Sequence, residues 1–481
     1  MANGPDSISR IAMRGFKSIS DEQQIELRPL TLLAGANSSG KSSLMQPVLL
    51  LKQTIEAPSD PGPLLLDGPN VHFASAEQLL SRMPGKGTAF EFGIKIELSS
   101  GRRLEVVFRR AEGVGFELVA TNSSYGAENL RIAPNMSHDE ILKVVAGSVK
   151  QFVTDKVMKG RRWSVYRERC FFSFLLSGEE GHFLSTPTIS LADRLIPRLQ
   201  ALIHLPGLRG NPQRTYPRRA TGPLFPGSFE AYTASIISQW QSKGDARLSQ
   251  LGAALEDMGL TWKVEAKSVD DTQIELRVGR LVHSRSGDDH DLVSIADVGF
   301  GVSQSLPVLV ALIVAEPGQV VYLEQPEMHL HPRAQRRLAH VLADAANRGV
   351  IVVAETHSAL LLREVQTLVA TDKLSTDKVK LHWVQRQEDG RTVVTPADLD
   401  ESGAYGDWPE DFDEVELNAE KDGLRKDLCL AEAACAGDGI VVTRDDAIQA
   451  IWHKCHDRLG VPKPITWINP VTDGVQALDH L

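Results

Sequence analysis

The chain has 481 residues, which is long enough for two or more domains. Its composition, 42% hydrophobic and 24% charged, is typical of a globular protein, and the lack of any apolar run of about 18 residues argues against a membrane span. A net charge of −10 argues against a wholly basic surface, although it leaves room for a local basic groove. Four cysteines are too few for a disulfide framework and the N-terminus lacks an apolar signal segment, so we expect a cytoplasmic protein with no membrane partner.

In the N-terminal half, the order of apolar and polar residues predicts strands first and helices later. Residues 8–34 alternate like two strands joined by a turn, and a helix is predicted from residue 41 to about residue 55. The segments FEFGIKIEL and RRLEVVFRR predict a β-hairpin that turns at Ser99–Gly101. Residues 137–203 have helical periodicity without a sustained heptad pattern, which excludes a long coiled-coil arm. A connection rich in Pro, Gly and Arg follows at 205–227.

In the C-terminal half, helices and strands alternate before an acidic segment. Two strands are predicted in TWKVEAKSV and TQIELRVGR. The other predicted elements are helices at 229–242, 246–258, 302–315 and 332–347, and strands at 319–323 and 350–355. The acidic segment 398–422 predicts a solvated linker, and helical periodicity returns in residues 420–481. This alternation predicts an α/β fold.

The clearest motif is GANSSGKS at residues 35–42, which fits the phosphate-binding pattern G-x-x-x-x-G-K-[ST] between a predicted strand and a predicted helix. Glycines allow backbone N–H groups to curl around a phosphate, and the helix N-terminus adds a partial positive charge. Lys41 would contact the β- and γ-phosphates, and the Ser42 hydroxyl would bind Mg²⁺. The segment therefore predicts a P-loop with ATP and Mg²⁺ as cofactors.

Two further signals lie at the ends of predicted strands. Glu324 ends the strand QVVYL, where a carboxylate normally holds the Mg²⁺ shell, and Thr356-His357 ends the strand VIVVAE. One predicted helix separates the two strands, so their ends should be neighbours on one edge of a parallel sheet. Taken singly, the plainer alternatives are a surface strand end for Glu324 and an ordinary polar residue for His357.

A fourth signal is DVGFGVSQ at residues 297–304, whose glycines and serine predict a second anion-binding helix N-terminus. In this order the four signals resemble the ABC-type ATPase head of the SMC, RecF and OLD families. The segments RGFKSI, LLAGANSSGKSSLMQ, LPGLRGNPQR, DVGFGVSQSLPVL, LEQPEMHLHPRAQ and ETHS are most similar to those of bacterial, OLD-like proteins of AAA type. The resemblance covers roughly residues 1–55 and 205–365.

The resemblance implies an α/β, ABC-type P-loop ATPase with a discontinuous head, a mixed N-terminal β-subdomain, a largely helical insertion and a small C-terminal region. The expected divisions are head lobe I with the P-loop at 1–130, the insertion and connection at 131–225, head lobe II at 226–400, and the acidic linker with a helical region at 401–481. Head lobe II would hold the signature helix, the acidic strand and the switch histidine.

ABC-type heads bind two ATP molecules between two subunits, so the resemblance implies a second copy of the chain as partner. The implied nucleotide-binding residues are Lys17, Gly35, Asn37, Ser38, Ser39, Gly40, Lys41, Ser42, Ser43, Gly299, Gly301 and Ser303. Of these, Gly299, Gly301 and Ser303 would reach the γ-phosphate of the other subunit's ATP. The implied catalytic residues are Glu324, Gln325, Glu327 and His357, with Ser42 and Glu324 as the Mg²⁺ residues.

One departure from the family pattern concerns hydrolysis. The residue after the Mg²⁺ carboxylate is usually a glutamate that orients the attacking water, and here it is Gln325. Glutamine positions water but cannot accept its proton, which favours slow turnover and a long-lived ATP-bound dimer. Glu327 is the nearest spare carboxylate that could act instead.

Three functions follow from the resemblance and are kept open. The leading hypothesis is a nucleotide-gated homodimeric switch in bacterial antiphage defence, with a separate effector protein. The second is a DNA-binding ATPase of RecF type, for which the basic and aromatic residues at 159–169 are the candidates, with the charged face of an amphipathic helix as the plainer alternative. The arginines at 209–219 form another basic run that could serve phosphate or a neighbouring subunit. The third is an OLD-type nuclease, although the C-terminal region has no glutamate before the aspartates of GDGIVVTRDD.

Overall fold

The computed structural model describes residues 6–83, 87–113, 115–148, 161–178, 188–283, 291–401 and 403–405, together with residues 440–442 and 466–468. The chain forms two compact units, residues 1–407 and residues 408–481. In the second unit the described residues are two strands that pair in parallel, β22 (Ile440–Val442) and β23 (Thr466–Ile468). The predicted C-terminal helices and most of the acidic segment lie outside the described residues.

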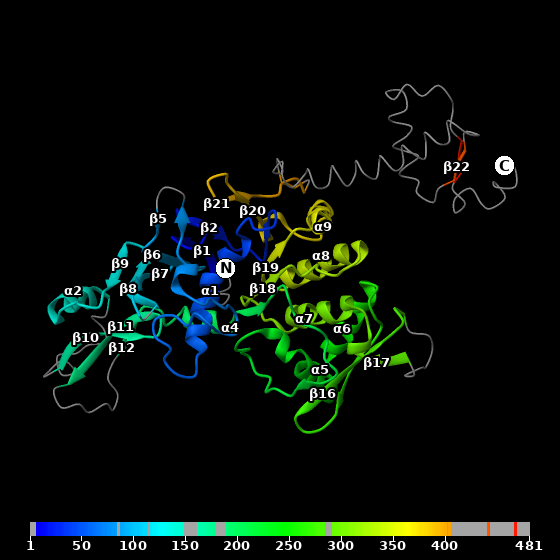
Figure 1. The fold of residues 1–481 in the computed structure, drawn as a ribbon, viewed down its shortest axis with the longest axis horizontal. Coiled ribbons are helices and arrows are strands. Elements are labelled where there is room, and N and C mark those ends of the chain that lie inside the picture. The colour runs from blue at the N-terminus through cyan, green and yellow to red at the C-terminus, as the bar shows by residue number, and fades with distance from the viewer. Residues whose placement is uncertain are drawn as a thin grey trace. The chain divides into compact units, whose positions relative to one another are not determined.

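The first unit is built on a six-stranded central sheet with the order β13-β18-β19-β3-β20-β21. Figure 1 labels its strands β18, β19, β20 and β21. The strands are β3 (Leu30–Ala34), β13 (Ile203–Leu205), β18 (Val320–Glu324), β19 (Ile351–Thr356), β20 (Val379–Arg386) and β21 (Thr392–Ala397). Neighbours are parallel except for the antiparallel pair β20–β21. The register pairs Glu324 with Glu355 and Thr356 with Ala34, so these strands end on one edge of the sheet, as the sequence predicts.

A second six-stranded sheet is antiparallel, with the order β2-β1-β6-β7-β8-β9. It consists of β1 (Ile8–Arg14), β2 (Gln23–Glu26), β6 (Glu91–Leu98), β7 (Arg103–Ala111), β8 (Gly115–Tyr125) and β9 (Glu128–Ile132), which includes the predicted hairpin β6–β7. Helix α1 (Lys41–Glu56) joins the two sheets in one core, where Val48 and Leu51 pack with Ile11 and Phe92 of this sheet and Val353 of the central sheet. A short pair, β4 (Arg82–Met83) and β5 (Gly87–Thr88), completes this part.

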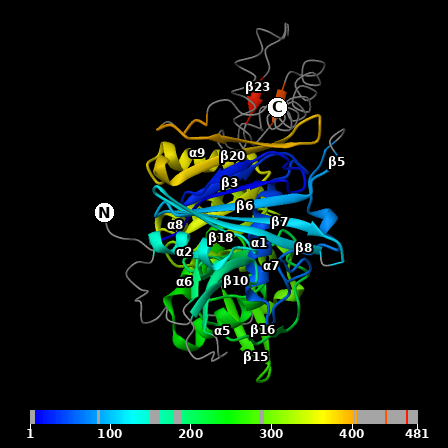
Figure 2. The same ribbon diagram turned by 90° about the vertical axis from the view of Figure 1, so that its left-hand side faces the viewer.

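Helices cover the other face of the central sheet. Val321 of β18 and Val352 of β19 alternate along their strands with the residues that face α1, so they lie on the opposite face of the sheet. Helix α7 packs against β18, and α8 packs against β19. These helices and their neighbours are α5 (Thr233–Lys243), α6 (Ala246–Asp257), α7 (Phe300–Val314), α8 (Pro332–Asn347) and α9 (Ala359–Ala370). A small antiparallel sheet lies beside α5, formed by β14 (Tyr216–Pro217), β15 (Val264–Ser268), β16 (Gln273–Gly279) and β17 (Leu292–Ser294), as Figure 2 also shows. The predicted α/β class is confirmed.

The insertion differs from the sequence-based prediction. Helices are present at α2 (His138–Ser148) and α4 (Ile196–Ala201), but residues 161–178 and 188–190 form a three-stranded antiparallel sheet where helix was predicted. Its strands are β10 (Arg161–Glu168), β11 (Phe171–Gly178) and β12 (Thr188–Ser190). The expectation of a largely helical insertion is therefore wrong for these residues, because an apolar run such as FFSFLL fits a buried strand as well as a helix. In the part of the chain that the structure describes, no helix is long and apolar enough to cross a membrane.

Candidate functional site

The P-loop connects β3 to α1, as the motif predicts. Two of its glycines leave no room for a side chain. A Cβ on Gly35 would lie 2.1 Å from the Val384 carbonyl oxygen, and a Cβ on Gly40 would lie 2.3 Å from Thr392 Oγ1. Gly40 also has a φ of 108°, in the left-handed region that favours glycine. The neighbouring strands β20 and β21 therefore hold the loop closely.

Lys41 fills the inside of this loop. Its Nζ donates to the carbonyl oxygens of Gly35 at 2.9 Å and Ala36 at 2.8 Å. Burial lowers the pKa of Lys41 to about 8, while the charges of Glu355 and Glu327 act in the opposite direction. The side chain therefore bonds its own loop and is mostly protonated at neutral pH.

Glu355, the first residue of the segment ETHS, was not predicted as a site residue but lies beside the P-loop serine. Ser42 Oγ donates to Glu355 Oε2 at 2.8 Å, and the Tyr322 hydroxyl donates to Glu355 Oε1. Burial and the nearby charge of Glu324 raise the pKa of Glu355 to about 7, although the hydrogen bonds from Tyr322 and Ser42 lower it. The sequence signals for this residue were its place in the segment ETHS and a carboxylate at the end of a predicted strand, directly before Thr356.

Glu324, the predicted Mg²⁺ carboxylate, shares Tyr322 with Glu355, but its other partners differ. His204 Nε2 lies 3.2 Å from Glu324 Oε1, and the Gly207 backbone N–H donates to Glu324 Oε2 at 3.1 Å. Burial raises the pKa of Glu324, but the hydrogen bond and charge of His204 and the bond from Gly207 bring the net pKa below its usual value. Glu324 is therefore an ionised carboxylate on the same sheet edge as Glu355.

Gln325 and His357 meet directly, with 2.8 Å between Gln325 Nε2 and His357 Nε2. His357 Nδ1 lies 2.8 Å from the Gly35 carbonyl oxygen, so Nδ1 carries the hydrogen and Nε2 accepts from the Gln325 amide. Burial and then the charge of Lys41 lower the pKa of His357, which favours this neutral form. Gln325 itself has a φ of 44°, in the left-handed region.

Glu327, the predicted spare carboxylate, supports the end of β19. Its Oε1 accepts from Thr356 Oγ1 at 2.7 Å and from the His357 backbone N–H at 3.0 Å. The side chain is buried, and among the described residues it does not line the cavity over the P-loop. These two hydrogen bonds hold the end of β19 and the backbone of His357 in position.

A cavity of about 770 Å³ lies over the P-loop, a volume that suits a small-molecule ligand. Lys17 reaches it from the first hairpin, where its Nζ donates to Gln46 Oε1 at 2.6 Å and lies 4.6 Å from the centre of the Phe73 ring. The predicted residues that line it are Lys17, Asn37, Ser38, Gly40, Lys41, Ser42, Ser43, Gln325 and His357. Ser39 is instead buried below the loop, where its carbonyl accepts from Thr392.

Several residues outside the predicted set also line this cavity, among them Gln46, Glu355 and Arg386. Gln46 follows Ser42 by four residues on α1, so helical spacing places both on one face and could have indicated it. Arg386 lies at the end of β20, where only the order of strands in the sheet brings it near the P-loop.

The predicted signature residues lie on another surface of the same chain. Gly299 directly precedes α7, Gly301 lies in its first turn, and Ser303 Oγ donates to the Phe300 carbonyl at 3.2 Å. Ser303 lines a separate hollow of about 400 Å³, together with residues 208–213. Among the described residues, those that line the P-loop cavity do not include any of α7.

The segment Gly207–Gly210 links this second surface to the strand that carries Glu324. Arg209 is buried, and its guanidinium donates to the carbonyl oxygens of Glu324 at 2.9 Å, Gln325 at 3.3 Å and Gln304 at 3.2 Å. Gln304, on α7, donates in turn to the Gly210 carbonyl at 2.8 Å. Burial lowers the pKa of Arg209 to about 10, which leaves it charged at neutral pH.

The basic candidates for DNA binding are largely engaged within the protein. Arg167 pairs with Asp60 at 2.6 Å, and Arg169 donates to the Thr54 carbonyl at 2.9 Å. Arg214 pairs with Asp297 at 2.8 Å. Residues 159 and 160 of the first patch lie outside the described residues. Arg167, Arg169 and Arg214 therefore have partners within the chain.

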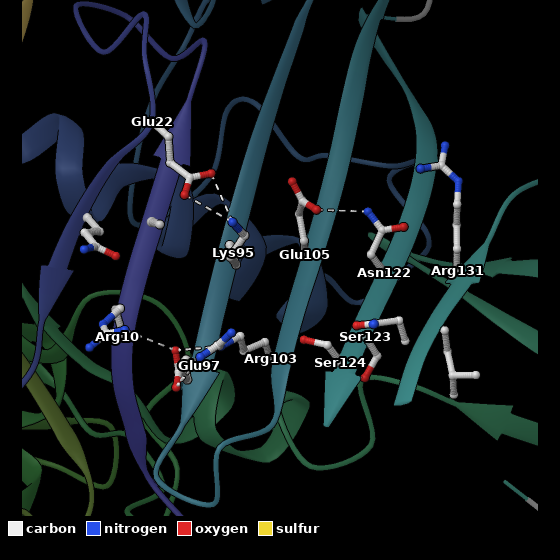
Figure 3. A pocket seen from close by; sticks show the side chains of 14 residues that line it. Arg10, Glu22, Lys95, Glu97, Arg103, Glu105, Asn122, Ser123, Ser124 and Arg131 are labelled. Carbon is white, nitrogen blue, oxygen red and sulfur yellow. Dashed lines mark hydrogen bonds and ion pairs between the residues drawn. The ribbon is translucent and has the colours of Figure 1, made fainter. Parts of the chain in front are cut away.

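The face of the antiparallel sheet has a hollow of about 540 Å³, lined mostly by charged and polar side chains (Figure 3). Charges of opposite sign pair on this face: Arg103 of β7 bonds Glu97 of the neighbouring strand β6 at 3.0 Å, and Lys95 of β6 reaches across β1 to Glu22, directly before β2, at 3.0 Å. Such cross-strand pairing is typical of a solvated sheet face.

Residues 169–363 match the family model described as "AAA domain, putative AbiEii toxin, Type IV TA system". The predicted resemblance to ATPases of AAA type is therefore confirmed, although the matched segment does not include the P-loop. No curated protein matches the sequence.

Similar solved structures are Smc head domains. One is bound to the C-terminal winged-helix domain of ScpA, with 12% identity, 82% of this chain and 99% of that chain covered, and a TM-score of 0.44. A second, from Pyrococcus furiosus, has an extended coiled coil and is bound to the C-terminal domain of ScpA, with 10% identity, coverage of 82% and 96%, and a TM-score of 0.40. The head domain from Thermotoga maritima has 11% identity, coverage of 82% and 100%, and a TM-score of 0.35.

Proposed function

We propose that this chain, a P-loop ATPase of AAA type, binds ATP with Mg²⁺ and acts as a nucleotide-gated homodimeric switch. The observation that carries the proposal is the division of the predicted site between two surfaces. Lys41, Ser42 and His357 line the P-loop cavity, whereas Ser303 lines the separate hollow at the start of α7. Two copies facing each other would bring each P-loop against the partner's α7, and each ATP would then join the two subunits.

The residues at the P-loop suit a nucleoside triphosphate with Mg²⁺. The loop amides and the N-terminus of α1 favour a bound anion. Lys41 would exchange its bonds to the Gly35 and Ala36 carbonyls for bonds to phosphate oxygens. The Ser42 hydroxyl and the Glu324 carboxylate are hard oxygen donors of the kind that Mg²⁺ prefers. Bound Mg²⁺ would neutralise charge on the phosphates.

Slow hydrolysis is part of this proposal. Gln325 is placed against His357, and its amide orients water without accepting the proton. ATP would therefore remain bound long enough to keep the two copies together, which is what a switch requires.

The biological role that we propose is bacterial antiphage defence in concert with a separate effector protein. The support is the description of the matched family, which names an AbiEii toxin of a type IV toxin–antitoxin system, together with the resemblance to OLD-like proteins. A RecF-type role in DNA binding has less support, because Arg167, Arg169 and Arg214 already bond within the chain.

The molecular mass in solution, with and without ATP and Mg²⁺, tests the switch. We expect light scattering to give 52.7 kDa without nucleotide and twice that mass with ATP. Lys41→Met, which removes the phosphate-binding ammonium, should stay monomeric in both conditions. Ser303→Arg, at the start of α7, should bind a fluorescent ATP analogue but not dimerise. A wild-type mass that does not change with ATP would contradict the proposal.

A further inference from the structure

Glu355 lies closer to the P-loop serine than its place in the sequence suggests. It is at the end of β19, the strand that pairs directly with P-loop strand β3, whereas Glu324 ends β18, one strand farther away. Ser42 Oγ donates to Glu355 Oε2 at 2.8 Å. A hydroxyl and a carboxylate in direct contact at the first turn of a P-loop helix are oxygen donors suited to one divalent cation.

Tyr322 interacts with both carboxylates, but their remaining contacts assign them different tasks. Tyr322 donates to Glu355 Oε1, which leaves Oε2 directed at Ser42. Both oxygens of Glu324 are engaged elsewhere, Oε1 by His204 at 3.2 Å and Oε2 by the Gly207 N–H at 3.1 Å. Glu355 is 2% exposed, so its carboxylate is held in this orientation by the packing of β19.

We infer that Glu355 is the carboxylate that binds the divalent cation together with Ser42. Glu324, which is held by His204 and Gly207, then supports this site without contacting the cation. The inference rests on the proposed binding of ATP and Mg²⁺ and changes which residue contacts the metal. Glu324 and Glu355 are opposite each other in the β18–β19 register, so the charge of Glu324 still contributes to the attraction of a cation.

The test is the dependence of nucleotide affinity on free Mg²⁺, measured with a fluorescent ATP analogue in EDTA and in a Mg²⁺ titration. Glu355→Gln keeps the shape of the side chain and removes the negative charge. It should bind the analogue in EDTA as the wild type does, and should need at least about tenfold more Mg²⁺ for half of the metal-dependent gain, because loss of even a supporting group commonly costs 10–100-fold in metal affinity. Glu324→Gln, the matched control, should shift the Mg²⁺ requirement less.

Two further measurements keep the result interpretable. Thermal unfolding establishes that each variant is folded, and Glu355→Asp, which retains a shorter carboxylate, should give an intermediate Mg²⁺ requirement. Mn²⁺ in place of Mg²⁺ allows electron paramagnetic resonance to report the metal bound with the nucleotide. A larger Mg²⁺ shift in Glu324→Gln than in Glu355→Gln would overturn the inference. Wild-type protein that binds no analogue at any Mg²⁺ concentration would contradict the proposed function itself.

Discussion

At the scale of single residues, the main question is how Gln325 affects hydrolysis. Its backbone takes a left-handed conformation, its N–H donates to the Glu355 carbonyl at 3.0 Å, and its amide contacts His357. The side chain is therefore held at the cavity by three separate features of the turn. A water placed beside it would find a hydrogen-bonding partner, but no proton acceptor on Gln325.

Gln325→Glu tests this consequence. We expect the turnover number for ATP to rise about 100-fold, because a positioned general base contributes on the order of 10²–10⁴ to rate. ATP affinity should change little, since Gln325 and Glu have the same size. Steady-state release of phosphate measures the rate, and Lys41→Met gives the background. A wild type that already turns over quickly, with no gain in the variant, would show that another group supplies the base.

At the scale of elements, the segment Gly207–Gly210 connects β18 with α7. Its bonds join the Glu324 carboxylate, the carbonyls of the Gln325 turn and the side chain of Gln304. The side chain of Leu208, which lies between Gly207 and Arg209 in this segment, is 84% exposed. A shift of α7 on contact with a second copy would therefore reach Glu324 through four residues, with Arg209 as the central link.

Arg209→Met removes that link. Loss of the guanidinium leaves three carbonyl oxygens without their donor, and we expect the free energy of unfolding to fall by about 1–3 kcal/mol. Urea denaturation measures this change. Arg209→Lys should recover only part of the lost free energy, because an ammonium group cannot make the same set of hydrogen bonds as a planar guanidinium. Arg214→Met, at an exposed ion pair, is the control and should cost less than about 1 kcal/mol. Equal losses at the two positions would rule out the linking role.

At the scale of the whole first unit, α1 and a few polar contacts join the two large sheets. His382 of β20 is 1% exposed, and its Nε2 lies 3.1 Å from the backbone nitrogen and 3.0 Å from the carbonyl oxygen of Glu26, on β2 of the other sheet. Burial lowers the pKa of His382 to about 4, and the charge of Lys380 acts in the same direction, although the hydrogen bond to the Glu26 carbonyl opposes both. The junction of the sheets therefore requires a neutral imidazole.

This requirement predicts a pH dependence of stability. The unfolded chain binds a proton at His382 below a pH of about 6.5, whereas the folded chain does so only near pH 4, so stability is complete above pH 6.5 and is lost as the pH falls between these values. Between pH 7 and pH 5 the loss from this residue should be about 2 kcal/mol. Urea denaturation at both pH values measures it. The same series on His382→Gln should lack this contribution, and His72→Gln, at an exposed site, is the control.

Much of the site could be predicted because its signals are local. The P-loop motif needs only a strand before it and a helix after it, and the spacing of Glu324 and His357 allows one helix between two parallel strands. By contrast, β10 and β11 were predicted as helix. The apolar run FFSFLL has no periodicity that distinguishes a helix from a strand. The hairpin is set by a turn at Arg169, with a φ of 54°, and by burial on both faces of β11, where Phe171 and Phe174 are within the core.

Short-range sequence thus decided where a phosphate would bind, since the geometry of a loop before a helix depends on a few consecutive residues. Which carboxylate contacts Ser42 was decided only in the folded chain. Glu324 and Glu355 both end apolar strands, and nothing local distinguishes them. The order β18-β19-β3 does so, because pairing between segments more than 300 residues apart places Glu355 next to the P-loop and leaves Glu324 one strand away.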